Sequence, residues 1–329
     1  MHGTSTFQEN PHRCNFFKIS LGIIALTVIS FTVQTLEASG YPNHPVQLIV
    51  PYGAGSGADL VARAIQPHAE KNLGAQLIIG NVPGADTRIG MTRVFKAAPD
   101  GYTIGLNSIP APIIQEYLFD VPYKSLDFTF IYAWASNFPL IFVAENSWKS
   151  FDDFIAEARK RPLTMGLPGF GTVVHLLGLV LEKHMNVKFK YVPYPGSAQG
   201  FTALAGNHID AGIGSADAAL GLIRAKKVRP ILNWSLHPDP EFPDVPLSKK
   251  YNLPTIAITR GVFGPLGIPA ERAGILEKAF LKAAANPKVA EWAKATGQDL
   301  TFLDAKQYRQ EAEKQRMLVG EYKDLLKTP

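Results

Sequence analysis

The sequence predicts an α/β protein with two lobes, each holding a central sheet flanked by helices, and a ligand cleft between the lobes. Three observations lead to this fold class. Short apolar and β-branched segments alternate with helical segments, which is typical of parallel sheets covered by helices. Turns rich in glycine and other small residues follow several of the predicted strands. The pattern restarts near residue 163, so the second half repeats the architecture of the first without clear sequence identity.

The first half begins with a strand over residues 46–50 and the glycine-rich turn 52–59 (YGAGSGAD). The helix that follows is expected to end at Gly74, because glycine often takes the left-handed conformation after a helix. Pro67 predicts a kink or a break in this helix, since proline removes one helix hydrogen bond. The further elements are expected as strands over 76–79, 102–106, 128–136 and 140–143, and helices over 113–118 and 151–161.

In the second half the small-residue turns are 167–172, 193–197 and 214–217, each between a strand and a helix. The predicted strands are 163–166, 189–192, 208–213 and 228–234, followed by a returning strand over 255–264 and helices over 270–286, 287–296 and 305–327. We therefore predict that residues 41–142 and 260–329 form domain 1, and that residues 143–259 form domain 2.

The chain has 329 residues, enough for two domains, and its net charge is +5. Its lysines and arginines are scattered and do not interleave with aromatic residues, so a nucleic-acid interface is not expected.

The N-terminus has the features of a signal for export. Arg13 and Lys18 precede an apolar run over 19–33, which is shorter than the ~20 residues of a membrane span. This pattern predicts a signal peptide over residues 1–38 and a periplasmic protein; a retained N-terminal anchor is the alternative. Ala38 suits the residue before cleavage, although Leu36 is large for its position. The only cysteine, Cys14, lies before the run, so neither a lipid anchor nor disulfides are expected in the mature chain.

The residues give no support for catalysis, a metal or a cofactor. Ala58 stands where a phosphate-binding loop would continue into its lysine, and Gly57 comes one residue too early for a dinucleotide fingerprint. Neither Ser56 nor Ser215 has the glycines of a nucleophile elbow. The sequence therefore predicts no catalytic residue, no metal ligand and no cofactor.

The repeated glycine-rich turns favour ligand binding. Glycine lets a ligand approach the backbone, and a helix start offers unpaired N–H groups to a small anion. A single turn of this kind can also serve tight packing of a strand on a helix. Because such turns recur after successive strands in both halves, and lie where ligands bind in open parallel sheets, we expect two facing sets of loops around a cleft.

Several motifs resemble the tripartite tricarboxylate transporter receptors, also called Bug proteins. Residues 41–63 (YPNHPVQLIVPYGAGSGADLVAR), 81–85 (NVPGA) and 97–103 (AAPDGYT) resemble the opening of these receptors. Residues 169–176 (GFGTVVHL), 192–198 (VPYPGSA), 209–212 (IDAG) and 243–246 (PDVP) resemble later motifs. The motifs occur in family order across nearly all of the expected mature chain.

The resemblance implies a type II periplasmic-binding-protein fold and an extracytoplasmic solute receptor. It implies a monomer without a cofactor that closes on a small organic carboxylate and delivers it to membrane permease subunits. Hinges are expected near residues 140–145 and 258–263. A periplasmic sensor for a signalling partner, or a secreted two-lobed enzyme, are the alternatives.

The resemblance also implies which residues face the ligand. In the family, two opposed loops hold a ligand carboxyl through backbone N–H groups, hydroxyls and water. Carried over by motif, the expected ligand-binding residues are Tyr52, Gly55, Ser56, Gly57, Ala58, Arg88, Ser108, Gly169, Phe170, Gly171, Thr172, Tyr194, Gly196, Ser197, Ser215 and Asp217.

Two loops depart from the family pattern. Ser56 and Ala58 stand where a glycine and a threonine are usual, so Ser56 is expected to replace the lost hydroxyl. Arg88 is either a clamp for a second carboxylate or a solvent-facing arginine paired with Asp86.

Four further side chains have structural alternatives to ligand binding. Asp59 is expected to cap a helix, and His175 to be an interior hydrogen-bonding residue. Tyr52 and Tyr194 either line the cleft or belong to the core.

Overall fold

The computed structural model describes residues 1–3, 40–296 and 298–327. The predicted signal peptide, residues 1–38, falls almost wholly outside the described residues. No described helix is long and apolar enough to cross a membrane. The chain divides into two units, Met1–Asn43 and His44–Pro329, and the second unit holds all the helices and strands that the structure describes.

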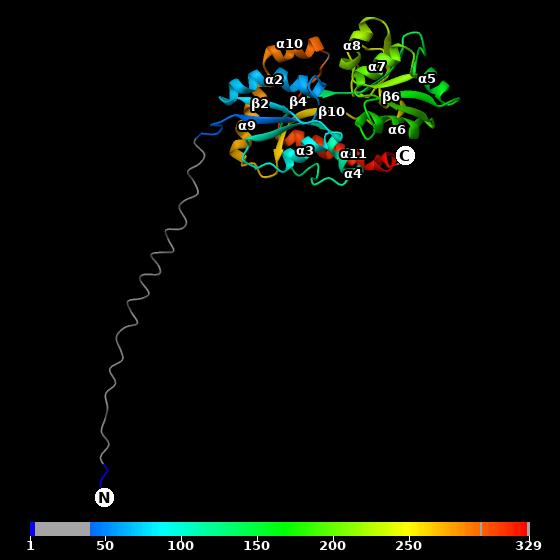
Figure 1. Ribbon diagram of the computed structural model, residues 1–329. Coiled ribbons are helices and arrows are strands. Elements are labelled where there is room, and N and C mark those ends of the chain that lie inside the picture. The colour runs from blue at the N-terminus through cyan, green and yellow to red at the C-terminus, as the bar shows by residue number, and fades with distance from the viewer. Residues whose placement is uncertain (4–39, 297, 328–329) are drawn as a thin grey trace. The chain divides into compact units, whose positions relative to one another are not determined.

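The first sheet has the strand order β11–β4–β10–β3–β1–β2 (Figure 1). Strands β1 (Val46–Val50), β2 (Leu77–Asn81) and β3 (Thr103–Ile109) are parallel, as the alternating pattern predicts. Strand β10 (Ile258–Pro265) is antiparallel to both β3 and β4 (Phe128–Asn137). The short β11 (Leu300–Leu303), which the sequence did not predict, pairs antiparallel with β4.

Helices pack against both faces of this sheet. Helix α2 (Gly57–Leu73) packs against α9 (Ala270–Ala284), and Phe280 of α9 stacks on Trp134 of β4. Helix α3 (Arg88–Phe95) packs in an apolar cluster with β1, β4 and β10. Helices α4 (Ala111–Leu118) and α11 (Ala305–Leu326) contact each other, and α10 (Pro287–Thr296) lies beside α2 and α9.

The second sheet has the order β7–β6–β8–β5–β9. Its strands are β5 (Leu140–Ala144), β6 (Leu163–Leu167), β7 (Phe189–Pro193), β8 (Ala211–Gly214) and β9 (Val228–Asn233). Strands β6, β7 and β8 are parallel, whereas β5 is antiparallel to β8 and β9. One apolar cluster joins this sheet to α5 (Phe151–Ala158) and α6 (Val173–Met185), and another joins it to α7 (Ser197–Ala205) and α8 (Ala216–Arg224).

The chain passes between the two sheets twice. Residues 138–139 connect β4 to β5, and residues 234–257, which include the 3₁₀ turn Ser248–Tyr251, connect β9 to β10. The segments expected as hinges, 140–145 and 258–263, largely coincide with strands β5 and β10, so the connections themselves lie beside them.

Helix α11 takes part in the core of both sheets. Its buried residues Tyr308, Val319 and Leu326 belong to one cluster with Phe130 of β4 and with α6. The core therefore continues from the first sheet to the second along this helix.

The start and end of α2 follow from its sequence. Ser56 is its N-cap, and Gly74 ends it in the left-handed conformation with φ 69°, as predicted. Of the two outcomes predicted at Pro67, a kink or a break, the break does not occur, because the helix continues through this residue; the kink stays a prediction.

Candidate functional site

The glycine-rich loop before α2 is held in shape by Asp59. The Asp59 carboxylate accepts hydrogen bonds from Gly55 N at 2.8 Å, Arg63 Nε at 2.9 Å and Asn81 Nδ2 at 2.9 Å. Burial raises the pKa of Asp59, but these bonds outweigh burial and the net pKa is lowered. The N-cap is Ser56, whose Oγ accepts from Asp59 N at 3.3 Å. The buried Asp59 side chain thus stabilises the loop through these hydrogen bonds. The expectation that Asp59 caps the helix was wrong.

Tyr52 and Ser108 lie together beside a buried arginine that the sequence did not single out. The Tyr52 hydroxyl hydrogen-bonds with Ser108. Burial raises the pKa of Tyr52, opposed by this bond and by the charge of Arg260. Arg260 is opposite Ser108 in the pairing of β10 with β3, so the sheet register brings the three residues together.

Arg260 is 8% exposed and has neutral hydrogen-bond partners. Its Nη1 donates to Asn137 Oδ1, and to Gln298 Oε1 at 3.0 Å. Its Nε is buried without a hydrogen-bond partner. Burial lowers the pKa of Arg260, and attraction to Asp217 and Tyr52 opposes the shift. The available sequence signal was a single arginine inside an otherwise apolar strand.

The two sets of loops meet at Gly57. A Cβ built on Gly57 would lie 3.4 Å from Arg260 Nη2 and 3.7 Å from Asp217 Oδ2. Asp217 belongs to the first turn of α8, which begins at a loop of the second sheet. Its Oδ1 accepts from Ser215 Oγ, and its Oδ2 accepts from Gln298 Nε2 at 2.5 Å. The structure therefore brings predicted residues of both halves, Gly57, Ser215 and Asp217, to one place.

A second contact joins the loop 168–172 to the first half. A Cβ built on Gly169 would lie 3.9 Å from Asp86 Oδ1, and Gln115 Nε2 donates to Gly171 O at 3.4 Å. Thr172 is the N-cap of α6: its Oγ1 accepts from His175 N at 3.3 Å and donates to Gly169 O at 2.8 Å.

His175 is buried, and its Nδ1 accepts from Gly171 N at 3.2 Å. The expectation of an interior hydrogen-bonding histidine is therefore confirmed. Because Nδ1 accepts, the proton of the neutral ring lies on Nε2. Burial lowers the pKa of His175 to about 4.

Arg88 lies at the start of α3 and stacks on an aromatic ring. Its Nε donates to Ala85 O at 2.7 Å, and its guanidinium carbon is 3.5 Å from the centroid of the Phe119 ring. Among the described residues it forms no ion pair with Asp86, so the expectation of that pair was wrong.

The predicted residues near α7 are in different surroundings. The ring of Tyr194 packs in the second-sheet core, where a Cβ on Gly166 or Gly200 would lie 3.3 Å from it. Gly196 is the N-cap of α7, so no side chain occupies its first N–H groups. Ser197 Oγ lies 3.1 Å from a Cβ built on Gly214. In the part of the chain that the structure describes, the contacts of Tyr194, Gly196 and Ser197 lie within the second sheet and its helices, and not at Arg260.

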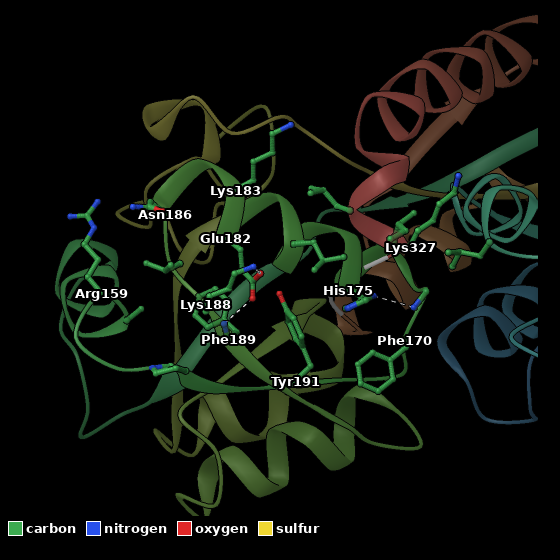
Figure 2. Close-up of a pocket in the computed structure, with 18 of the residues that line it drawn as sticks. Arg159, Phe170, His175, Glu182, Lys183, Asn186, Lys188, Phe189, Tyr191 and Lys327 are labelled. Carbon is green, nitrogen blue, oxygen red and sulfur yellow. Dashed lines mark hydrogen bonds and ion pairs between the residues drawn. The ribbon is translucent and has the colours of Figure 1, made fainter. Parts of the chain in front are cut away.

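A pocket of about 1120 Å³ lies beside the loop 168–172 (Figure 2). It shares only Phe170 and Gly171 with the predicted ligand residues. Figure 2 shows His175 and Tyr191 toward its interior, and Glu182 accepts from Lys188 Nζ at 2.9 Å. Cations that include Arg159, Lys183 and Lys327 line it. Arg260 does not line this pocket, so the pocket and the meeting point of the loops are separate places.

A smaller pocket of about 400 Å³ includes Asn137 and Gln298, the two partners of Arg260. Asp299 in its lining has a raised pKa, because it is buried and lies near Asp239 and Asp217. Within the described residues, no group of histidine, cysteine, aspartate and glutamate side chains could hold a metal ion.

Comparisons with known proteins place the chain in a family. The model of the tripartite tricarboxylate transporter family receptors matches residues 61–321. The chain is 32% identical over 282 residues to the UPF0065 protein in the tcbD-tcbE intergenic region of Pseudomonas sp. strain P51, covering 83% of each chain. It is 29% identical to the protein BugT of Bordetella pertussis, covering 71% of this chain and 74% of BugT.

A solved structure shows the same fold. MatC of Rhodopseudomonas palustris with bound malate superimposes with a TM-score of 0.74 at 25% identity, covering 87% of this chain and 100% of MatC. The two helix-flanked sheets are those of the two-lobed periplasmic binding proteins, as predicted. The chain therefore belongs to the tripartite tricarboxylate transporter receptors, the Bug family of solute-binding proteins.

Proposed function

We propose that this receptor binds a small carboxylate between its two lobes, in the periplasm, and delivers it to the permease subunits of a tripartite transporter. Residues 41–142 with 260–329 would form one lobe, residues 143–259 the other, and residues 1–38 the cleaved signal peptide. One observation carries the proposal: Gly57, at the start of α2, faces both Arg260 of the first sheet and Asp217 of α8, which packs on the second sheet.

The surroundings of Gly57 suit an anion. Helices α2 and α8 begin at the two loops that meet there, and α8 has no side-chain hydrogen bond at its N-cap. Such helix starts offer N–H groups and the positive end of the helix dipole to a carboxylate. The malate bound to MatC, a relative of the same fold, supports the same ligand class here.

A receptor role also fits the serines of the site. Ser56 is engaged as the N-cap of α2, and Ser215 donates to Asp217. Neither hydroxyl contacts a histidine or lysine base in the described residues. We therefore infer that the protein binds and releases its ligand unchanged.

A thermal-shift screen on the chain without residues 1–38 tests the proposal. The panel contains mono- and dicarboxylates, aromatic acids and amino acids, with sugars and divalent metals as controls. A ligand at a hundred times its Kd adds about 2.7 kcal/mol to the free energy of unfolding, which raises the Tm of a chain this size by several degrees. A Tm shift with sugars or metals, and with no carboxylate, would overturn the proposal.

A further inference from the structure

Arg260 is a buried cation that lacks an ion-pair partner among the described residues. It lies within β10, between Thr259 and Gly261, and only 8% of it is exposed. Taking a guanidinium out of water is costly unless an opposite charge compensates it. In the described part of the chain, however, no carboxylate forms an ion pair with Arg260. The site therefore has a positive charge whose counter-charge is incomplete.

The hydrogen bonds of Arg260 leave one edge of the guanidinium available. Its Nη1 donates hydrogen bonds to two neutral amide oxygens, those of Asn137 and Gln298. Its Nη2 points toward Gly57, because a Cβ there would lie 3.4 Å away. Gly57 has no side chain, so no Cβ fills the space beside Nη2.

The carboxylate of Asp217 lies close to Arg260 but does not pair with it. Asp217 attracts Arg260 electrostatically, but its Oδ1 accepts from Ser215 and its Oδ2 from Gln298. The Asp217 carboxylate is thus held beside Arg260 without being bonded to it.

We propose, on the basis of the proposed function, that Arg260 is the charged anchor of the ligand site. It would select a ligand that carries a second negative charge. Nη2 binds one carboxylate of the ligand, next to the hydroxyls of Tyr52 and Ser108. The other carboxylate lies at the helix starts of the opposing loops. A guanidinium suits this role because it keeps its charge when buried and donates in a fixed direction.

Calorimetric titrations of the chain without residues 1–38 test this assignment. The probes are malate, succinate, glutarate and adipate, each compared with its half-amide, which keeps the shape and loses one charge. The variant is Arg260→Gln, which keeps a polar side chain and removes the charge. The control is Arg309→Gln, which removes an exposed arginine of α11 paired with Glu313.

The wild type is expected to prefer at least one diacid over its half-amide by about 10- to 100-fold, the range for a hydrogen bond between charged groups. Arg260→Gln is expected to reduce this preference to within about threefold, and Arg309→Gln to keep it. If Arg260→Gln keeps the preference, or weakens diacid and half-amide equally, the anchor role is overturned while the receptor function stands. If no acid binds the wild type, the receptor proposal fails and this inference with it.

The Tm without ligand separates an anchor from a structural arginine. If Arg260 is an anchor, its uncompensated buried charge destabilises the ligand-free protein. Arg260→Gln and Arg260→Met are therefore expected to leave the ligand-free Tm unchanged or to raise it. In both variants the Tm shift caused by the diacid is expected to shrink to that caused by its half-amide. A lower ligand-free Tm together with an intact diacid shift would show that Arg260 only supports the fold.

Discussion

Gln298 Nε2 donates a 2.5 Å hydrogen bond to Asp217 Oδ2, and this bond joins the segment before β11 to the start of α8. Gln298 also accepts from Arg260 through its Oε1. One amide therefore connects the buried cation on one sheet to the carboxylate that comes from the other. The charge of Asp217 is consequently placed where a ligand carboxylate would approach Arg260.

Asp217→Asn is expected to tighten the binding of a dicarboxylate. The substitution keeps an acceptor for Gln298 but removes a negative charge near the ligand carboxylate that is proposed to bind Arg260. Like charges at this range repel by one to a few kcal/mol, so the Kd of a dicarboxylate that the protein binds should fall on the order of tenfold at low salt. Titration calorimetry at low and high salt measures this Kd. A weaker binding of the dicarboxylate at both salt concentrations would contradict the prediction.

The pair of Glu116 with Arg316 predicts loss of stability in acid. Arg316 Nη1 and Nη2 donate to the two Glu116 oxygens at 2.6 Å and 3.0 Å, and Ser125 adds two bonds. Burial raises the pKa of Glu116, but these bonds lower it to about 2. The folded pKa lies below the unfolded value, so the pair stabilises above about pH 4.5, and this contribution is lost as pH falls toward 2.

The size of this effect is about 3 kcal/mol at neutral pH, since each pKa unit corresponds to about 1.4 kcal/mol. Glu116→Gln should reduce the loss of stability between pH 4.5 and 2 by about this amount, as measured by urea unfolding. Glu157→Gln, at an exposed pair with Lys160 and Arg161, is the control and should keep it. An unchanged slope in Glu116→Gln would exclude this pair as the cause.

His175 predicts a separate loss of stability at milder pH. Its pKa of about 4 in the folded protein lies below the ordinary histidine value of 6.5, because burial disfavours the charged ring. The unfolded chain therefore binds more protons between these values, and stability falls as pH drops from 6.5 toward 4. NMR titration should show the His175 ring neutral at pH 5.5, with its resonances assigned by their absence in His175→Gln. A midpoint near 6.5 in the folded protein would refute this.

Local patterns predicted the alternating part of the fold well. The strands β1 to β3, the N-terminal loop of α2 and its end at Gly74 all follow from short-range sequence signals. The position of β10 between β3 and β4 could not be predicted in this way, because antiparallel pairing of distant segments leaves no periodic pattern in the sequence. The four residues of β11 are too few for a pattern to be visible.

The site shows the same limit. Glycine-rich loops indicated where backbone would approach a ligand, and Gly57, Ser108, Ser215 and Asp217 do gather. Arg260 was missed, because its place depends on the register of β10 with β3 and on amides from distant segments. Tyr52 and Tyr194 could not be told apart from composition. The structure puts Tyr52 beside Ser108 and Tyr194 in the core under α7.

Gly261, next to Arg260, is expected to tolerate no side chain. A Cβ there would lie 2.5 Å from Tyr132 O and 2.7 Å from Ala133 Cα, both backbone atoms of β4. Backbone of a central sheet cannot move aside as a flexible side chain can, so Gly261→Ala should lower the free energy of unfolding by about 2–4 kcal/mol.

Gly274→Ala in the interior of α9 is the matched control, since a Cβ there meets nothing within 4 Å. It should raise stability by about 0.5–1 kcal/mol, because alanine loses less backbone entropy than glycine in a helix. Urea unfolding of both variants measures the two effects, and a Gly261→Ala variant as stable as the wild type would show that β10 and β4 are less closely paired than the structure has them.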